Sequence, residues 1–117
     1  MKTHMDDPER TARAWLAFSD AGKFEASWQA TATHFRSQLT QADWVSRLNA
    51  ARSPLGPASS RVLKSSQTVT DLPDGPPGEY VVMEFETVFS SGAAHGERIT
   101  TIKDNDGVLR VVGYYLV

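Results

Sequence analysis

The sequence contains no cysteine, and this absence excludes disulfide bonds, thiolate nucleophiles and the usual cysteine-containing zinc sites. It also has no apolar run long enough to cross a bilayer, and its N-terminus lacks the apolar core of a secretion signal. Basic charge is not in excess, because 12 Lys and Arg against 14 Asp and Glu give a formal net charge of −2. We therefore expect neither membrane insertion nor nucleic-acid binding by this chain.

The chain has the size and composition of one ordinary domain. Of its 117 residues, 40% are hydrophobic and 22% are charged, and a chain of this length buries roughly two thirds of its unfolded surface. Residues 1–5 are an exception, because a second methionine that follows His4 is typical of an expression leader rather than of native sequence. Residues 6–117 are therefore predicted to form a single domain.

Three short helices are predicted in the N-terminal half. Asp7 is an N-cap ahead of a proline, and the first helix is expected to end near Asp20, because a glycine two residues later tolerates the left-handed conformation. A second helix is predicted from Lys23 to about Phe35, and a third from Thr40 to the prolines that follow residue 52. The side chains expected to face the core are Ala12, Trp15, Leu16, Phe24, Trp28, Ala32, Trp44, Leu48 and Ala51.

Four strands are predicted in the C-terminal half. The alternation from Glu79 to Phe89 separates an apolar face from a mixed face, as in a strand covered by helices on one side. Further strands are predicted at about 59–70, 95–103 and 108–117, with a hairpin turn at Asp104–Gly107. Helices followed by strands predict an α+β domain in which three helices pack on a four-stranded antiparallel meander. The predicted helix-facing residues of the 79–89 strand are Val81, Met83, Phe85 and Phe89, and the other face holds Tyr80, Val82, Glu84, Glu86 and Val88.

The last predicted strand is apolar on both faces. An antiparallel sheet with one face in water normally alternates apolar and polar residues, so a partner subunit or further structure is expected to cover the second face. We predict a homodimer that forms through the sheet. One face of this strand carries Val108, Val112, Tyr114 and Leu116, and the other carries Leu109, Val111, Tyr115 and Val117.

A set of short motifs follows a specific order along the chain. The motifs are Asp20-Ala-Gly-Lys-Phe24, Ser27-Trp28, Thr40 followed by Trp44, Arg52-Ser-Pro-Leu-Gly56, Arg61, Gly78-Glu-Tyr-Val-Val82, Phe89, Glu97 and Gly113-Tyr-Tyr115. Together they resemble the bacterial family called domain of unknown function 4019, from about Arg13 over nearly the whole chain. The resemblance implies a cystatin-like or nuclear-transport-factor-2-like roll and no established activity. Many members of that family look exported, which implies a periplasmic or secreted location for a chain whose native leader has been removed, with the cytoplasm as the alternative.

Two tryptophans and a tyrosine are candidates for contact with a ligand. Trp28 and Trp44 lie on apolar helical stripes, where each ring either completes the core or lines a cleft between helices and sheet. The core role is favoured, because burial of one such ring removes roughly 200 Å² from water. Tyr114, on the last predicted strand, is a candidate hydrogen-bond donor.

Two arginines bracket the rigid, proline-containing turn at residues 53–57. Arg52 and Arg61 either converge on the carboxylate or phosphate of a small anionic ligand, or anchor this turn by bonding its carbonyl groups or Glu97. The structural role is favoured, because a turn with two prolines has few N–H groups of its own to hold it in place.

Catalysis has few candidate residues. Glu84 and Glu86 share a strand face about 7 Å apart and suit an acid–base pair, although solubility or ion pairing across the sheet is the favoured role. His34 and His95 also titrate near neutrality, but neither is accompanied by a nucleophile or an oxyanion donor, so surface or capping roles are expected.

The hairpin segment superficially resembles a calcium loop. Ile102 stands where the first ligand belongs, and no bidentate glutamate follows Asp104–Gly107. We therefore expect a turn there, and no metal or cofactor is predicted for the chain.

Two functions remain as hypotheses. The favoured one is a non-catalytic module that binds a small molecule or a protein. The alternative is a small hydrolase or isomerase that uses a carboxylate or a histidine in a helix–sheet cleft, with Tyr80, Tyr114 or Tyr115 as hydrogen-bond donors. A pocket around the candidate carboxylates or His95 would favour the enzyme, whereas an open surface would not.

Overall fold

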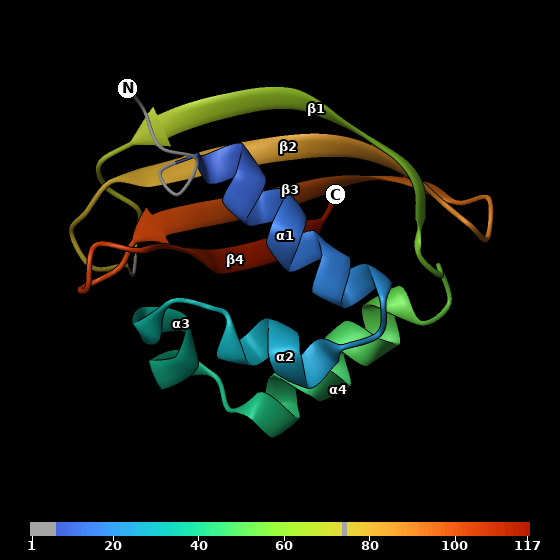
Figure 1. Cartoon of the computed structure of the whole chain (residues 1–117), viewed down its shortest axis with the longest axis horizontal. Helices are drawn as coiled ribbons and strands as arrows, with labels where there is room; N and C mark the ends of the chain where they lie inside the picture. The colour runs from blue at the N-terminus through green and yellow to red at the C-terminus, as the bar shows by residue number, and fades with distance from the viewer. Residues whose placement is uncertain (1–6, 74) are drawn as a thin grey trace.

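The computed structural model describes residues 7–73 and 75–117, so the predicted leader at residues 1–5 lies outside the described residues. In the described part of the chain, the strands form one antiparallel sheet in the order β1-β2-β3-β4, and Figure 1 shows α1 lying across it. The predicted α+β class and the four-stranded meander are therefore confirmed. The elements are α1 (Pro8–Asp20), α2 (Phe24–Gln29), α3 (Thr33–Gln38), α4 (Gln41–Arg52), β1 (Ala58–Val69), β2 (Tyr80–Phe89), β3 (Ala94–Lys103) and β4 (Leu109–Leu116).

The second of the three predicted helices is two helices in the structure, α2 and α3. The chain leaves helical geometry between them, where Thr31 forms a parallel bridge with Val111 of β4. The backbone N–H of Ala32 donates to the carbonyl oxygen of Val111 at 2.8 Å, and Ala32 itself is extended, with φ −67° and ψ 156°. A bond to a distant strand therefore interrupts a helix that local periodicity predicts as continuous.

The predicted ends of α1 are confirmed. The Asp7 side chain accepts a hydrogen bond from the backbone N–H of Glu9 at 3.0 Å, which caps the N-terminus of the helix. After the helix, Gly22 has a φ of 73°, a left-handed conformation that a glycine adopts without strain. This stop places Asp20 in the last turn of α1, beside α4 and the sheet.

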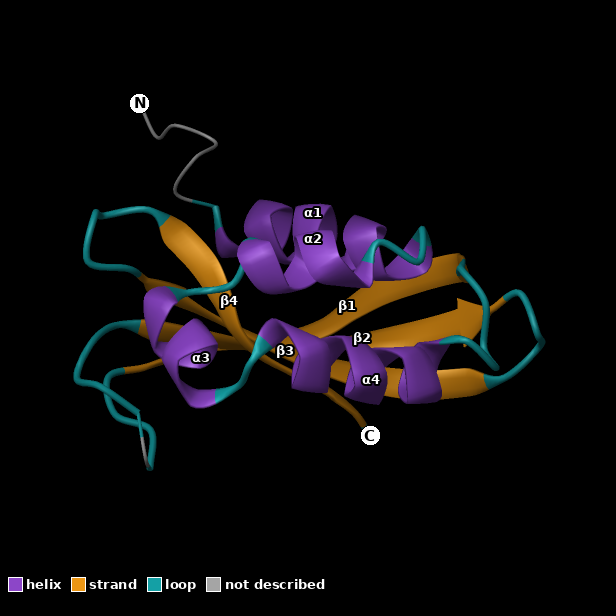
Figure 2. Cartoon of the chain, turned by 90° about the horizontal axis from the view of Figure 1, so that it is seen from below, coloured by secondary structure: helices purple, strands orange, loops and turns teal. Residues whose placement is uncertain are grey.

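The helices cover one face of the sheet, and in Figure 2 they form a separate layer in front of the strands. Met83, Phe85 and Phe89 on β2 are at most 1% exposed, whereas Glu86 and Val88 of the same strand are exposed. The predicted alternation of β2 is therefore confirmed over this stretch. The core between the two layers contains Ala12, Trp15, Leu16, Trp44, Leu48, Met83, Phe85, Ile99, Val111 and Tyr114.

Tyr80 departs from the predicted pattern, because it is buried although it shares the parity of the mixed face. It packs against the aliphatic side chains of Ala32 and Ile102 and against Leu72 from the segment between β1 and β2. Its hydroxyl donates to the carbonyl oxygen of Pro76 at 2.5 Å. The segment between β1 and β2 therefore folds back over this end of the sheet.

The strands are not all paired in simple register. β1 has register shifts against β2 between Ala58 and Ser60 and between Leu63 and Ser65. β4 shifts against β3, so that Thr100 pairs with Gly113 while Thr101 pairs with Val111. Such an extra residue in one strand changes which face the following side chains occupy.

The shift in β4 explains why both parities of this strand are apolar. Val111 and Tyr114 differ in parity, yet both are buried in the core between helices and sheet. Tyr115 and Val117 remain exposed, at 63% and 55%. Much of the apolar surface that suggested a partner is thus used within the chain, and the homodimer through the sheet stays a prediction.

Candidate functional site

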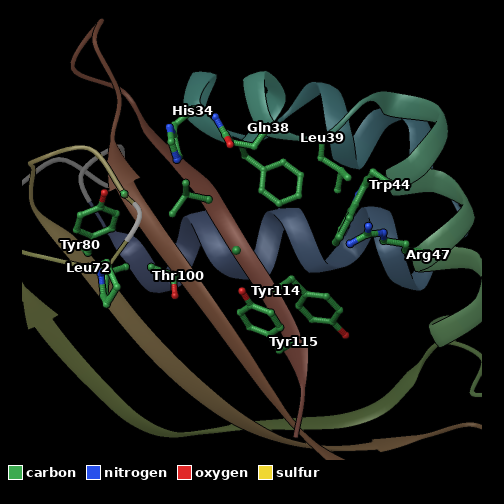
Figure 3. Close-up of a pocket in the computed structure, with 15 residues that line it drawn as sticks. His34, Gln38, Leu39, Trp44, Arg47, Leu72, Tyr80, Thr100, Tyr114 and Tyr115 are labelled. Carbon is green, nitrogen blue, oxygen red and sulfur yellow. The ribbon is translucent and has the colours of Figure 1, made fainter.

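A cavity of about 340 Å³ lies between α3, α4, β4 and the segment that joins β1 to β2 (Figure 3). We call it the α3–β4 cavity. Its volume is in the range of pockets that hold small ligands. Its lining is His34, Phe35, Gln38, Leu39, Trp44, Arg47, Leu72, Pro73, Gly75, Tyr80, Thr100, Val112, Gly113, Tyr114 and Tyr115.

The aromatic wall of the cavity is held in place by packing and by a hydrogen bond. The rings of Phe35 and Trp44 meet edge to face, with centroids 5.0 Å apart. Behind them, Trp15 contacts both Trp44 and Tyr114, with centroids 6.2 and 5.2 Å apart. The indole N–H of Trp44 donates to the Ser27 hydroxyl at 3.0 Å, so its polar atom is satisfied within the core. The wall is therefore held in place by contacts within the chain.

Of the three aromatic candidates, the structure brings two to this cavity. Trp44 and Tyr114 line it, whereas Trp28 does not. Trp28 is half-buried, and its indole N–H donates to the Leu39 carbonyl oxygen at 2.8 Å. It thereby holds the turn between α3 and α4 in place.

The lining of the cavity carries little formal charge. Among the described residues, Arg47 is the only formally charged side chain in the lining, and no aspartate or glutamate is part of it. Arg47 was not among the residues predicted from the sequence, although it follows Trp44 by three residues and so lies on the neighbouring part of one helical face. The cavity thus combines aromatic walls with one cation.

A separate group of polar side chains is buried around Glu97, which has no exposed surface. Its carboxylate accepts hydrogen bonds from Arg61 Nε at 2.7 Å, from the Thr87 hydroxyl at 2.6 Å and from the Tyr114 hydroxyl. A fully buried carboxylate with three donors is well compensated for its loss of water.

Asp20 joins a second carboxylate to the same group. It accepts two hydrogen bonds from Arg61, at 2.8 and 3.0 Å, and one from Arg52 Nη2 at 2.6 Å. Arg52 Nη2 also donates to the Gly56 carbonyl oxygen at 3.2 Å, and Arg52 Nη1 lies 3.8 Å from Glu97 Oε2. These contacts join α1 and α4 to all four strands. The buried charge network, as we call it, consists of Asp20, Arg52, Arg61, Thr87, Glu97 and Tyr114.

Arg52 and Arg61 do converge on a carboxylate, but it is that of Asp20 in the same chain. Arg52 also bonds a carbonyl group of the turn at residues 53–57, and Arg61 bonds Glu97. Neither arginine lines the α3–β4 cavity. The geometry therefore favours the structural alternative for both.

The network shifts the pKa values of its members. Burial acts to raise the pKa of Asp20, but the hydrogen bonds and charges of Arg61 and Arg52 outweigh burial and hold the pKa below its ordinary value. Burial likewise acts to lower the pKa of Arg61, yet its bonds to Asp20 and Glu97 raise it. Burial and the neighbouring Glu97 carboxylate raise the pKa of Tyr114. At neutral pH the Asp20 and Arg61 charges and the Tyr114 proton are therefore all retained.

The lowered pKa of Asp20 predicts a loss of stability in acid. The unfolded chain binds a proton at this carboxyl group at a higher pH than the folded chain does, so the free energy of unfolding falls as the pH drops below about 4. Urea denaturation at pH 7 and pH 3 measures this loss.

Other carboxylates contribute to acid sensitivity, so the test needs a variant. The pKa values of Asp104 and Asp106 are also lowered; burial opposes the shift at Asp104, and Arg110 bonds both groups. Asp20→Asn is expected to be less stable at pH 7 and to lose less stability between pH 7 and pH 3 than the unchanged chain. An equal loss in both proteins would contradict the role of Asp20.

Among the candidate catalytic residues, Glu84 and Tyr115 line one hollow on the outer face of the sheet, and the described lining of that hollow does not include Glu86 or His95. Glu84 lies on the outer face of the sheet, where it pairs with Arg98 at 3.3 Å, and Glu86 is exposed on the same face. His95 lies beside Phe89, with ring centroids 6.2 Å apart. Glu84, Glu86 and His95 do not line the α3–β4 cavity, whose described lining contains His34 but no carboxylate.

The spacing of α1 contains a signal for the place of Asp20 in the buried charge network. Asp20 follows Leu16 by one turn and so continues the buried stripe of α1. On α4, Ala51 was predicted to face the core, but it is exposed. Arg52, which follows Leu48 by four residues, takes the buried position and is 2% exposed.

Among residues 7–73 and 75–117, none of the helices has the length and hydrophobicity that a membrane span requires.

No curated protein and no solved structure matches the chain, so the cystatin-like or nuclear-transport-factor-2-like assignment stays a prediction. The family described as Protein of unknown function (DUF4019) matches residues 11–114. This match spans most of the sequence, including every member of the buried charge network and most of the cavity lining. The chain therefore belongs to the DUF4019 family.

Proposed function

We propose that this protein is a non-catalytic binding module whose small ligand occupies the α3–β4 cavity. The observation that carries the proposal is the aromatic wall, which is held by ring packing and by the bond from Trp44 to Ser27. A preformed apolar pocket with a few polar groups is the usual form of a small-molecule site. Catalysis at this position would need an acid or a base, and the residues of the lining that the structure describes offer His34 without a carboxylate to orient it.

A neutral fluorescent dye tests whether the cavity accepts apolar molecules. N-phenyl-1-naphthylamine is expected to bind saturably, with a rise in dye fluorescence and energy transfer from tryptophan, because Trp44 forms part of the wall. Gly113→Val fills part of the cavity. A Cβ atom at Gly113 meets only ordinary contacts, the nearest being Tyr115 Cε2 at 3.9 Å, so the variant is expected to fold.

The expected result is a loss of dye affinity of about tenfold or more in Gly113→Val, because the added side chain takes the volume that the dye needs. Ala94→Val is the matched control, since Ala94 is an exposed strand residue outside the cavity lining. It is expected to bind the dye as the unchanged chain does. Absence of saturable binding, or equal affinity in Gly113→Val, would contradict the proposal.

A further inference from the structure

The α3–β4 cavity has an uneven distribution of charge. Arg47 contributes a permanent positive charge, and among residues 7–73 and 75–117 no aspartate or glutamate lines the cavity. His34 is the other side chain of the lining that gains positive charge on protonation. A pocket of this composition attracts an anion and disfavours a cation.

Arg47 forms no ion pair with a carboxylate in the part of the chain that the structure describes. Five other arginines of the described residues form ion pairs, and no such pair includes Arg47 in residues 7–73 and 75–117. Asp43 lies one turn earlier on α4, but no ion pair joins the two. In Figure 3 the Arg47 side chain lies beside Trp44 and extends from α4 toward β4. Its guanidinium group is therefore placed to receive a planar, bidentate acceptor such as a carboxylate.

The shape of the walls favours a flat molecule. Phe35 and Trp44 present aromatic surfaces from the helices, and Tyr114 presents a ring from β4 on the same side of the sheet. Planar rings pack against such surfaces by stacking or by edge-to-face contact. A ligand that joins an aromatic ring to an acid group therefore matches both the aromatic walls and Arg47.

We infer that the ligand is an aromatic carboxylate, or a flat molecule of the same chemistry, whose ring lies against Phe35 and Trp44 and whose acid group bonds Arg47. This inference rests on the proposed function, since it names the class of molecule that the cavity takes. It also moves the predicted small anionic ligand away from Arg52 and Arg61, whose guanidinium groups already bond Asp20 and Glu97.

Three matched naphthalene compounds test the charge. They are 2-naphthoate, its neutral amide 2-naphthamide, and the cationic 2-naphthylmethylammonium, each titrated into the protein by calorimetry. The naphthoate is expected to bind about tenfold more tightly than the amide, and the ammonium compound more weakly than both. Added salt is expected to weaken binding of the naphthoate and to leave binding of the amide nearly unchanged.

Arg47→Gln identifies the residue responsible. This variant is expected to bind the naphthoate about tenfold more weakly and to bind the amide with unchanged affinity, because only the charged bond is lost. Arg10→Gln is the control, since Arg10 is an exposed arginine on α1 outside the cavity lining. Arg47 is itself exposed, so its replacement is not expected to impair folding.

The outcomes separate the inference from the proposed function. Equal affinity for the naphthoate and the amide would overturn the inference that the ligand is an aromatic carboxylate. An unchanged preference of Arg47→Gln for the naphthoate over the amide would overturn it as well. Both results would leave the cavity as a binding site. Binding of the neutral dye but of none of the three naphthalene compounds would have the same meaning. If neither the dye nor these compounds bind, the proposed function fails and the inference fails with it.

Discussion

Replacement of Glu97 by alanine is expected to lower the free energy of unfolding by about 3–5 kcal/mol, the range for breaking a buried ion pair from one side. The loss leaves Arg61, whose side chain is 9% exposed, with Asp20 as its remaining acid. The hydroxyl groups of Thr87 and Tyr114 lose their acceptor at the same time. Urea or guanidinium denaturation measures the change.

Glu84→Ala is the control for this prediction. Glu84 also pairs with an arginine from a neighbouring strand, but its side chain is 39% exposed and that of Arg98 is 47% exposed. Exposed pairs contribute little, so a change below about 1 kcal/mol is expected. If Glu97→Ala destabilises the chain no more than Glu84→Ala does, the buried charge network does not support the fold.

Phe85→Ala is expected to have an effect of similar size, about 3–5 kcal/mol, because it leaves a cavity at the centre of the sheet. Phe85 is 0% exposed and packs in the cluster formed by α1, α4 and the middle strands. Thermal and chemical denaturation measure the loss, and the slope of the denaturant curve shows whether the fold itself is retained.

Val88→Ala on the same strand provides the comparison. Val88 is 41% exposed on the opposite face, so the expected change is within about 1 kcal/mol and reflects strand propensity. Similar losses in the two variants would mean that the helices do not cover the face that carries Phe85.

Local patterns in the sequence were sufficient for most of the architecture. The helical spacing of Trp15 and Leu16, the capping residue Asp7 and the alternation along β2 each depend on neighbours in the chain, and each was predicted correctly. The division between α2 and α3 was not, because it depends on a bond between Ala32 and Val111. No local pattern contains a contact between residues so far apart.

The candidate site was harder to predict for the same reason. The sequence marked Trp44 and Tyr114 as aromatic candidates, but it did not show that α3, α4 and β4 would enclose them with Arg47. The position of the segment between β1 and β2 over Tyr80 depends on tertiary contacts rather than on its own turn residues. For Arg52 and Arg61, the pairing with Asp20 required the stop of α1 to be placed against the sheet.

The bond between Ala32 and Val111 has a consequence for association between molecules. An outer strand with unpaired N–H and C=O groups is a template on which further chains build fibrils. In β4, part of that template is occupied by the link between α2 and α3. In β1, the two register shifts and the exposed Lys64 oppose the flat, apolar edge that fibril growth needs. Both edge strands of the sheet thus carry features that oppose amyloid-like stacking.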